Sequence, residues 1–415
     1  MMKKINKLVF LCLSAAMSTL SASIIDNRFI PWFARTTLRT IENRSFCKVD
    51  GFFVTANSAH GNESKEKKGI PEVYGDFDQK IFGQALETVG KTNYLTPAWQ
   101  AARDVLWGAH GKLQGQGFDI HAEYALNKNF SMGMNWGWVH MTCNQKFVLL
   151  KETIRSLGLT TADEVTIETQ RRNMFKELGF NDSEWSDSSM TDLVLYARLG
   201  GVRDYVMKFR SADFSFYCAG IIPVTKKRDI NHPAAIPFGG DGLAGIMVGF
   251  DTHLEVKEDI WFSWSSRLSQ RFAKIQNRRI PVLGEPEIFG ATTGDMKVTP
   301  GVNLMFSPTL TFNDLQGGFG AQLQYVYSAH YGDMWSDERA DKTIAIDISN
   351  IYAKGTKWFS EYLLFQLCYD FGKVSPARRR INPMVTFSWD IPIDFIGTEH
   401  RANTQRIGLG ITFQF

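Results

Sequence analysis

The chain of 415 residues has no long apolar run, little proline, few cysteines and no excess of charge of either sign. No window of about 18 apolar residues occurs, so we expect no transmembrane helix. The cysteines include no pair at a metal-ligand spacing such as CxxC, so no metal site is expected. The net charge of +3 argues against a nucleic-acid partner. Phosphate-binding and dinucleotide-binding glycine motifs are missing as well, and we expect no cofactor.

The first 23 residues have the three parts of a secretory signal peptide. A basic start with three lysines precedes a short apolar stretch, Leu8 to Met17, and small residues follow at positions 21–23. The apolar stretch is too short to span a bilayer. We therefore predict export with cleavage just before Ile24, and we expect residues 24–44 to form a periplasmic or lumenal segment.

The last nine residues, Ile407 to Phe415, alternate between apolar and small or polar side chains. This is the pattern of a strand with one face in an apolar phase. At the edge of an open sheet such a strand would promote aggregation, whereas in a closed barrel its apolar face can meet lipid.

The chain end also resembles a known signal. The terminal aromatic Phe415, Phe413 two residues before it and Gly410 three before that resemble the C-terminal assembly signal of Gram-negative outer-membrane β-barrels. Gly408 departs from the family pattern, which usually has a polar residue there. The resemblance implies an outer-membrane location, contact with outer-membrane lipid and insertion by the barrel assembly machinery.

Two-residue alternation recurs along the rest of the mature chain. The clearest segment runs from Val298 to Phe312, and a weaker one runs from Phe46 to Ala56. The segments number about twelve, an even number as bacterial barrels require. We predict an all-β fold in residues 45–415, a membrane-spanning antiparallel up-and-down β-barrel of about 12 strands with short helices in long outer loops.

The connections between these segments support the same fold, because short and long ones alternate with one exception at residues 392–401. Outer-membrane barrels have short periplasmic turns and long outer loops. The long connections are residues 58–112, 144–189, 225–241, 273–295 and 332–357.

The first long loop carries helix signals at residues 76–107. Asp76 and Gln79 have the spacing of a capping box, and Gly90 ends the apolar stripe that follows. Thr96 begins a second predicted helix with a proline at its first position.

A later loop carries a helix signal at residues 162–178, with Thr161 and Glu164 at capping-box spacing and Gly179 as its end. Amphipathic helices at a barrel rim can fold into the lumen as a constriction, pack together as a cap, or lie on the outer rim. The sequence leaves these three arrangements open.

Charged residues on the faces that point away from lipid are candidates for the lumen lining. In pores, such charges select solutes, and the basic residues here favour anionic ones. The alternative is that these charges pair with one another and leave no path, since a width of twelve strands does not decide between a filled and an open interior. The candidates are Arg198, Asp213, Asp251, Glu255, Arg267, Arg271, Lys297, His330, Asp390 and Arg406.

Tryptophans within or at the ends of the predicted strands are interpreted as an interfacial girdle. A track of inward aromatic residues that stack on sugars is the alternative for a few positions. The predicted girdle residues are Trp136, Trp138, Trp261, Trp264, Trp358 and Trp389.

Together these features favour an outer-membrane channel or transporter for small polar solutes, anionic ones among them, with a charged lumen. A plugged barrel with a structural or adhesive role is the alternative, and an outer-membrane hydrolase is a third hypothesis. Catalysis is disfavoured because Ser328 and His330 share an inward face without an evident third partner. We therefore expect no enzyme. The solute, the oligomeric state and any cysteine pairing do not follow from the sequence.

Overall fold

The computed structural model describes residues 28–29, 45–61, 67–75, 77–91, 105–206, 208–281, 285, 287–344, 346, 355–374 and 382–415. The predicted signal peptide and most of the segment 24–44 lie outside the described residues. Within these ranges no helix is both long and apolar enough to cross a bilayer.

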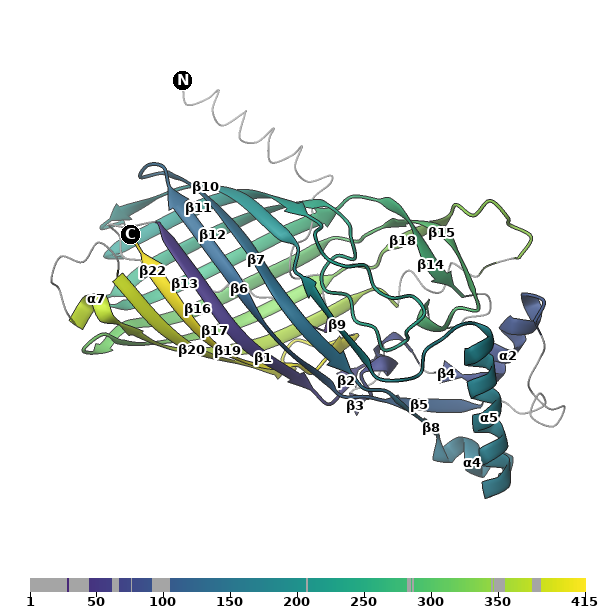
Figure 1. Ribbon diagram of the computed structural model, residues 1–415. Coiled ribbons are helices and arrows are strands. Elements are labelled where there is room, and N and C mark those ends of the chain that lie inside the picture. The colour runs from purple at the N-terminus through teal and green to yellow at the C-terminus, as the bar shows by residue number, and fades with distance from the viewer. Residues whose placement is uncertain are drawn as a thin grey trace.

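Twelve antiparallel strands close into a barrel, as predicted (Figure 1). Each strand pairs with its neighbour in the chain, β22 pairs with β1, and β7 pairs with β10. The strands of the wall are β1 (Phe46–Ala56), β6 (Leu113–Ala125), β7 (Phe130–Cys143), β10 (Leu193–Asp204), β11 (Ser211–Ile222), β12 (Gly245–Lys257), β13 (Ile260–Arg271), β16 (Asn303–Gln316), β17 (Phe319–His330), β19 (Trp358–Asp370), β20 (Asn382–Ile393) and β22 (Gln405–Gln414).

The strand that begins with β9 (Trp185–Met190) and continues as β10 is bent in the middle. β9 pairs with the outer half of β7, with Met190 opposite Trp138, whereas β10 pairs with its inner half, with Val194 opposite Asn135. The register changes by one residue between these pairs, which is the signature of a β-bulge. The bulge falls at Thr191 and Asp192, and it aims the Asp192 side chain into the mouth of the barrel.

An apolar band surrounds the barrel, because every second side chain of each strand points outward. Exposed Phe, Leu, Ile, Val, Met and Trp side chains occur in this band on strands all round the wall. On this face Trp264, Phe306, Tyr327 and Phe359 form a ladder of stacked rings across β13, β16, β17 and β19. Apolar side chains exposed at this density need lipid around them.

One end of the barrel carries the short turns, and there β1 begins and β22 ends. In outer-membrane barrels the short turns face the periplasm, so we assign this end as the periplasmic end. The turn between β16 and β17 consists of Gly317 and Gly318, both at positive φ, as a two-residue hairpin requires. The opposite end carries the long loops.

The prediction of one continuous strand from Val298 to Phe312 was wrong in one respect, because the structure divides this segment between β15 and β16. β15 (Thr292–Thr299) ends before Pro300 and pairs with β14 (Lys274–Ile280) and β18 (Met334–Asp337) in a separate sheet above the rim. The barrel strand β16 starts only at Asn303. Pro300 has no N–H for a ladder, which makes it a natural break between the two.

Two further small sheets lie above the rim. One contains β4 (Phe77–Asp78), β5 (Leu106–His110) and β8 (Lys146–Leu149), and the other contains β2 (Ala59–His60), β3 (Lys67–Lys68) and β21 (Arg401–Ala402). The short helices are η2 (Pro71–Tyr74), α2 (Gln79–Thr88), α4 (Lys151–Leu157), α5 (Thr161–Glu177) and η3 (Glu287–Phe289), with α7 (Phe371–Val374) at the periplasmic end.

Short helices in the long outer loops are as predicted, but their details differ. The side chain that caps α2 is Asp78, while Asp76 lies outside the described residues. α5 is capped by Thr160 and Asp163, one residue before the predicted pair. The second helix predicted in the first loop falls mainly outside the described residues, and its predicted end at residue 107 is part of the strand β5.

The outer helices pack together as a cap beyond the rim (Figure 1). Its core is aromatic, with Phe77, Phe82 and Phe175 in edge-to-face contact. The guanidinium of Arg171 lies 4.3 Å from the ring centre of Phe147. Of the three arrangements that the sequence leaves open, the structure shows the cap.

Candidate functional site: the lumen and its outer mouth

The charged residues of the lumen pair with one another. Arg198 of β10 lies 3.4 Å from Glu123 and 3.1 Å from Asp213. Further along the wall, Arg267 contacts Asp251 at 2.6 Å. These side chains occupy the inward-facing positions of their strands. Each contacts a side chain of opposite charge on an adjacent or nearby strand. Paired charges of this kind solvate one another and leave a small net field.

Two more pairs complete the set. Arg406 contacts Asp390 at 2.6 Å, and Lys48 contacts Asp50 at 2.9 Å. Arg406, Asp390, Arg198, Asp213 and Arg267 are all less than a tenth exposed. The predicted mixture of charges is therefore present inside the barrel, where each cation contacts a carboxylate and Arg198 contacts two.

The remaining predicted residues lie elsewhere. Glu255 lies near the periplasmic end, 3.9 Å from Arg210. Arg271 and His330 lie at the outer mouth. The prediction for Lys297 was wrong: it is exposed on β15, above the rim, because the strand break at Pro300 separates it from the barrel wall. Trp358, predicted for the girdle, is instead buried and faces the mouth.

Below the mouth, the lumen wall formed by β13, β16, β17, β19, β20 and β22 consists mainly of inward serine, threonine and glutamine side chains. Several of their buried polar atoms have no hydrogen-bond partner within the described protein. Buried polar groups in folded proteins are satisfied by protein or by ordered water. These atoms therefore have hydrogen-bonding capacity that the described protein does not use. They include Ser269 Oγ, Ser328 Oγ, Ser360 Oγ, Gln366 Oε1, Thr386 Oγ1 and Thr412 Oγ1.

The outer half of the lumen is filled by a loop. Residues 223–244, the connection between β11 and β12 and here called the inward loop, bring four apolar side chains into the barrel mouth: Ala234, Ala235, Ile236 and Phe238, each at most 2% exposed. They pack against inward side chains of β1, β6 and β7 and against Phe29. This apolar contact closes the mouth over the polar part of the lumen.

Asp192, at the bulge between β9 and β10, fastens both ends of the inward loop to the wall. Its carboxylate accepts hydrogen bonds from Thr225 Oγ1 at 3.2 Å and from Gly240 N at 3.0 Å. It also pairs with Arg271 of β13 at 2.5 Å. A side chain at Gly240 would collide with the Arg271 guanidinium, which would then have to move away from its buried pair with Asp192.

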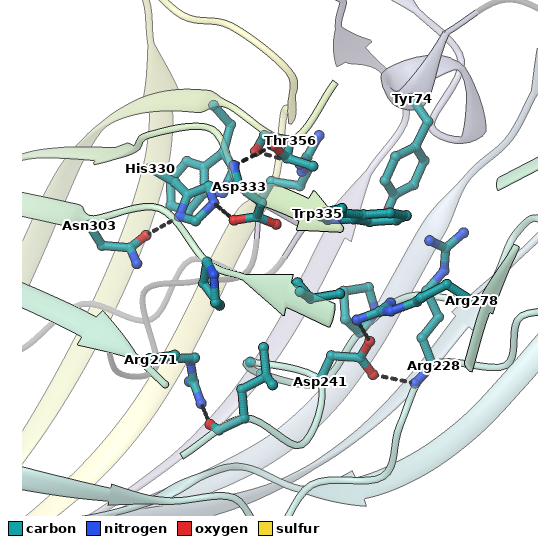
Figure 2. A pocket seen from close by; sticks show the side chains of 18 residues that line it. Tyr74, Arg228, Asp241, Arg271, Arg278, Asn303, His330, Asp333, Trp335 and Thr356 are labelled. Atoms are coloured by element: carbon teal, nitrogen blue, oxygen red, sulfur yellow. Dashed lines mark hydrogen bonds and ion pairs between the residues drawn. The ribbon is translucent and has the colours of Figure 1, made fainter. Parts of the chain in front are cut away.

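A cavity of about 120 Å³ lies between the inward loop and the strands at the rim (Figure 2). Four arginines and two aspartates line it: Arg28, Arg228, Arg271, Arg278, Asp241 and Asp333. Its apolar lining includes Tyr74, Trp335 and Trp358.

The two aspartates of the cavity are both engaged. Asp241 pairs with Arg278 at 2.5 Å. Asp333 contacts His330 Nε2 at 2.9 Å, and Asn303 lies 2.8 Å from the other ring nitrogen. Burial acts to raise the pKa of Asp333, but His330, the Gly301 N–H and Arg28 together hold that pKa below its ordinary value. Asp241 is thus held by an ion pair and Asp333 by hydrogen bonds.

Arg228 differs from the other arginines of the cavity. Its guanidinium donates to the Ala235 carbonyl at 3.0 Å and lies 4.7 Å from the centre of the Tyr74 ring. Within the described parts of the chain it pairs with no carboxylate. The guanidinium of Arg228 is thus a positive charge in the cavity without a carboxylate partner among the described residues.

Sequence reasoning did not find Asp192, Asp333 or Arg228. Asp192 interrupts an alternating strand, which is a weak sign of a bulge. Asp333 and Arg228 lie in long loops, where nothing in the local pattern shows which residues converge. The two residues described from the segment 24–44 also reach the mouth: Arg28 donates to the carbonyls of Gly355 and Thr356.

Of the residues that carry the C-terminal resemblance, Gly410 and Phe413 lie on β22 and Phe415 directly follows its last residue. Phe413 and Phe415 point outward and are 36% and 48% exposed, so lipid can reach both. Gly410 faces the lumen opposite Asp50 of β1.

The sequence matches no protein-family model and no curated protein. Among solved structures, an outer-membrane channel from Pseudomonas putida F1 is similar, with a TM-score of 0.52 and 8% identity over 92% of this chain and all of that one. The toluene transporter TodX of Pseudomonas putida (TM-score 0.33, 10% identity, 95% of each chain) and the translocator domain of the autotransporter NalP of Neisseria meningitidis (TM-score 0.35, 9% identity, 90% of each chain) align more loosely.

The likeness to the first structure is one of fold. It agrees with the closed barrel, the apolar outer band and the sorting of short turns and long loops to opposite ends. The protein is a twelve-stranded β-barrel of the Gram-negative outer membrane.

Proposed function

We propose that the protein is a gated channel that passes small polar solutes, with a preference for anions, across the outer membrane. The observation that carries the proposal is the row of buried hydroxyl and amide atoms without protein partners along the lumen. A barrel built only for structure would gain stability by filling these positions with apolar side chains. A hydrated lumen retains them.

The gate in this proposal is the inward loop. Its apolar residues 234–238 pack into the mouth, and Asp192 binds both of its ends to the wall. Further polar contacts hold the loop to β9 at Lys226 and to β14 at Asn231 and Asp241. Loops that fold into a barrel can leave it without breaking the wall, because wall strands pair only with each other. The fold it shares with a structure described as an outer-membrane channel supports the same proposal.

Anion preference rests on the mouth cavity. Both aspartates there are engaged by His330 and Arg278, while Arg228 has no carboxylate partner among the described residues. A solute that enters through the mouth meets this positive charge first, and a charge at a constriction sets selectivity.

One observation favours the alternative of a structural or adhesive surface barrel. The cap of α2, α4 and α5 has its own aromatic core and stands beyond the rim, where it could meet other molecules. This role needs no open lumen, so the same experiment separates the two functions.

The experiment is single-channel recording in a planar bilayer, with a salt gradient across it. The wild type is compared with a variant in which residues 232–238 are replaced by a flexible linker of equal length. We expect rare, brief current steps from the wild type and frequent, larger current steps from the variant. The sign of the reversal potential should show that anions pass more readily than cations.

A control variant, in which residues 394–398 at the tip of the last outer loop are replaced by a flexible linker of equal length, controls for disturbance of the rim. Silence of the loop variant in protein shown to be folded by heat-modifiable electrophoresis would refute the channel and leave the structural role.

A further inference from the structure

The mouth cavity combines the features of a ligand-binding site. It is concave, it is bounded by elements far apart in sequence, and it presents aromatic and aliphatic surface next to a few charged groups. Small-molecule sites have this composition: mostly apolar walls and a small number of placed polar groups. Figure 2 shows the labelled side chains converging from both sides of the cavity.

The polar groups of the cavity specify an anion. Because Asp241 and Asp333 are held by Arg278 and His330, neither is available to bind a cation. Arg228 uses its Nε for the Ala235 carbonyl, and no hydrogen bond ties its two terminal nitrogens within the described chain. A guanidinium with free terminal N–H groups is a fork that fits the two oxygens of a carboxylate.

The apolar groups specify the rest of the ligand. Tyr74 and Trp335 line the cavity on the side of the rim, and Pro237 and Leu243 line it on the side of the inward loop. A small inorganic anion would leave this surface in contact with water. A carboxylate attached to one ring, or to a short apolar chain, would cover it.

We propose that this cavity is a binding site for small organic carboxylates with an apolar body, in which Arg228 holds the carboxylate. This inference rests on the proposed channel function, because a binding site at the entrance to the lumen serves a channel. It goes beyond that function by naming the class of ligand. Because Arg228 and Leu243 belong to the inward loop, a bound carboxylate would contact the gate directly.

The test is titration calorimetry of the wild-type protein in detergent with benzoate, with benzamide as the neutral molecule of the same shape, and with inorganic phosphate. We expect benzoate to bind at least tenfold more tightly than either. Equal binding of benzoate and benzamide would overturn the role of charge, and tighter binding of phosphate would overturn the role of the apolar body.

Variants then locate the site. Arg228→Gln should weaken benzoate binding tenfold or more and leave benzamide unchanged, and Arg228→Lys should lie between the two because it keeps the charge but loses the fork. Arg210→Gln, the same change at an exposed arginine near the periplasmic end, should have no effect. Unchanged binding by folded Arg228→Gln would refute the site.

Calorimetry does not depend on transport, so the two proposals fail separately. Binding of benzoate by a protein that never conducts would refute the channel and retain the site. Conduction without binding would refute the site and retain the channel.

Discussion

At the scale of single residues, the outer loops depend on buried polar groups whose charge state is set by their surroundings. His400 is an example. It is 3% exposed, it lies in the last outer loop, and its Nδ1 donates to the Lys357 carbonyl at 2.8 Å. Burial and the nearby positive charges of Arg28 and Lys357 lower its pKa from 6.5 to about 4. In the folded protein this histidine is therefore neutral at pH 6.

The pH dependence follows from the sign of that shift. The unfolded chain takes up a proton on His400 near pH 6.5, whereas the folded protein does so only near pH 4, so acid favours the unfolded form. The contribution of neutral His400 to stability is complete above pH 6.5. It is lost as the pH falls toward 4, by at most about 1.4 kcal/mol per pH unit.

We expect the urea midpoint of the wild type to fall between pH 7 and pH 4.5, and the fall to be smaller in His400→Gln. At pH 8 the slopes of the two midpoints against pH should be the same, which is the internal control. An imidazole resonance of His400 that titrates at 6.5 in the folded protein would contradict this account.

At the scale of elements, the bulge between β9 and β10 and the inward loop act together. The bulge places Asp192 where it can bind Thr225, Gly240 and Arg271 at once. Removing one member of a buried ion pair costs about 3–5 kcal/mol, because the other charge stays buried without its partner. The attachment of the loop therefore depends strongly on this one carboxylate.

Asp192→Asn is predicted to loosen the inward loop without unfolding the barrel, because the wall strands keep their pairing. The expected result is a several-fold rise in the frequency of channel opening in planar bilayers. Asp187→Asn is the matched control, since Asp187 pairs with Lys226 of the same loop but on the exposed surface. Surface pairs contribute only about 0–1 kcal/mol, and the control should behave as the wild type does. Equal opening of both variants would contradict the role of Asp192.

At the scale of the whole molecule, the barrel followed from local rules. Alternation identifies strands such as β1, and the lengths of the connections assign the two ends, because both patterns reflect which face and which end meet lipid or water. The proline at position 300 marks the strand break, but the alternation of apolar and polar residues continues across it. The alternation therefore predicted Lys297 to lie in the lumen.

The closed mouth could not be predicted in the same way. Ala234–Phe238 look like any short apolar run in a loop, and only the packing of that run against β1, β6 and β7 gives it a role. Asp333 and Arg228 come together from two loops that are far apart in sequence. Contacts of this kind depend on the whole fold and leave no periodic pattern.

The central claim is that the lumen below the mouth is filled with water, and cysteine accessibility tests it most directly. Thr386 and Val385 are neighbours on β20: Thr386 points into the lumen and is 1% exposed, whereas Val385 points to lipid. Each is replaced by cysteine in protein whose four described native cysteines are changed to serine. A membrane-impermeant thiol reagent with a sulfonate group is then added from the periplasmic side.

The account predicts that Thr386→Cys reacts readily and Val385→Cys hardly at all. Reagent added from the outer side alone should leave Thr386→Cys unmodified until residues 232–238 are replaced by the linker. Failure of Thr386→Cys to react from the periplasmic side, in protein shown to be folded, would contradict a hydrated lumen and with it the channel.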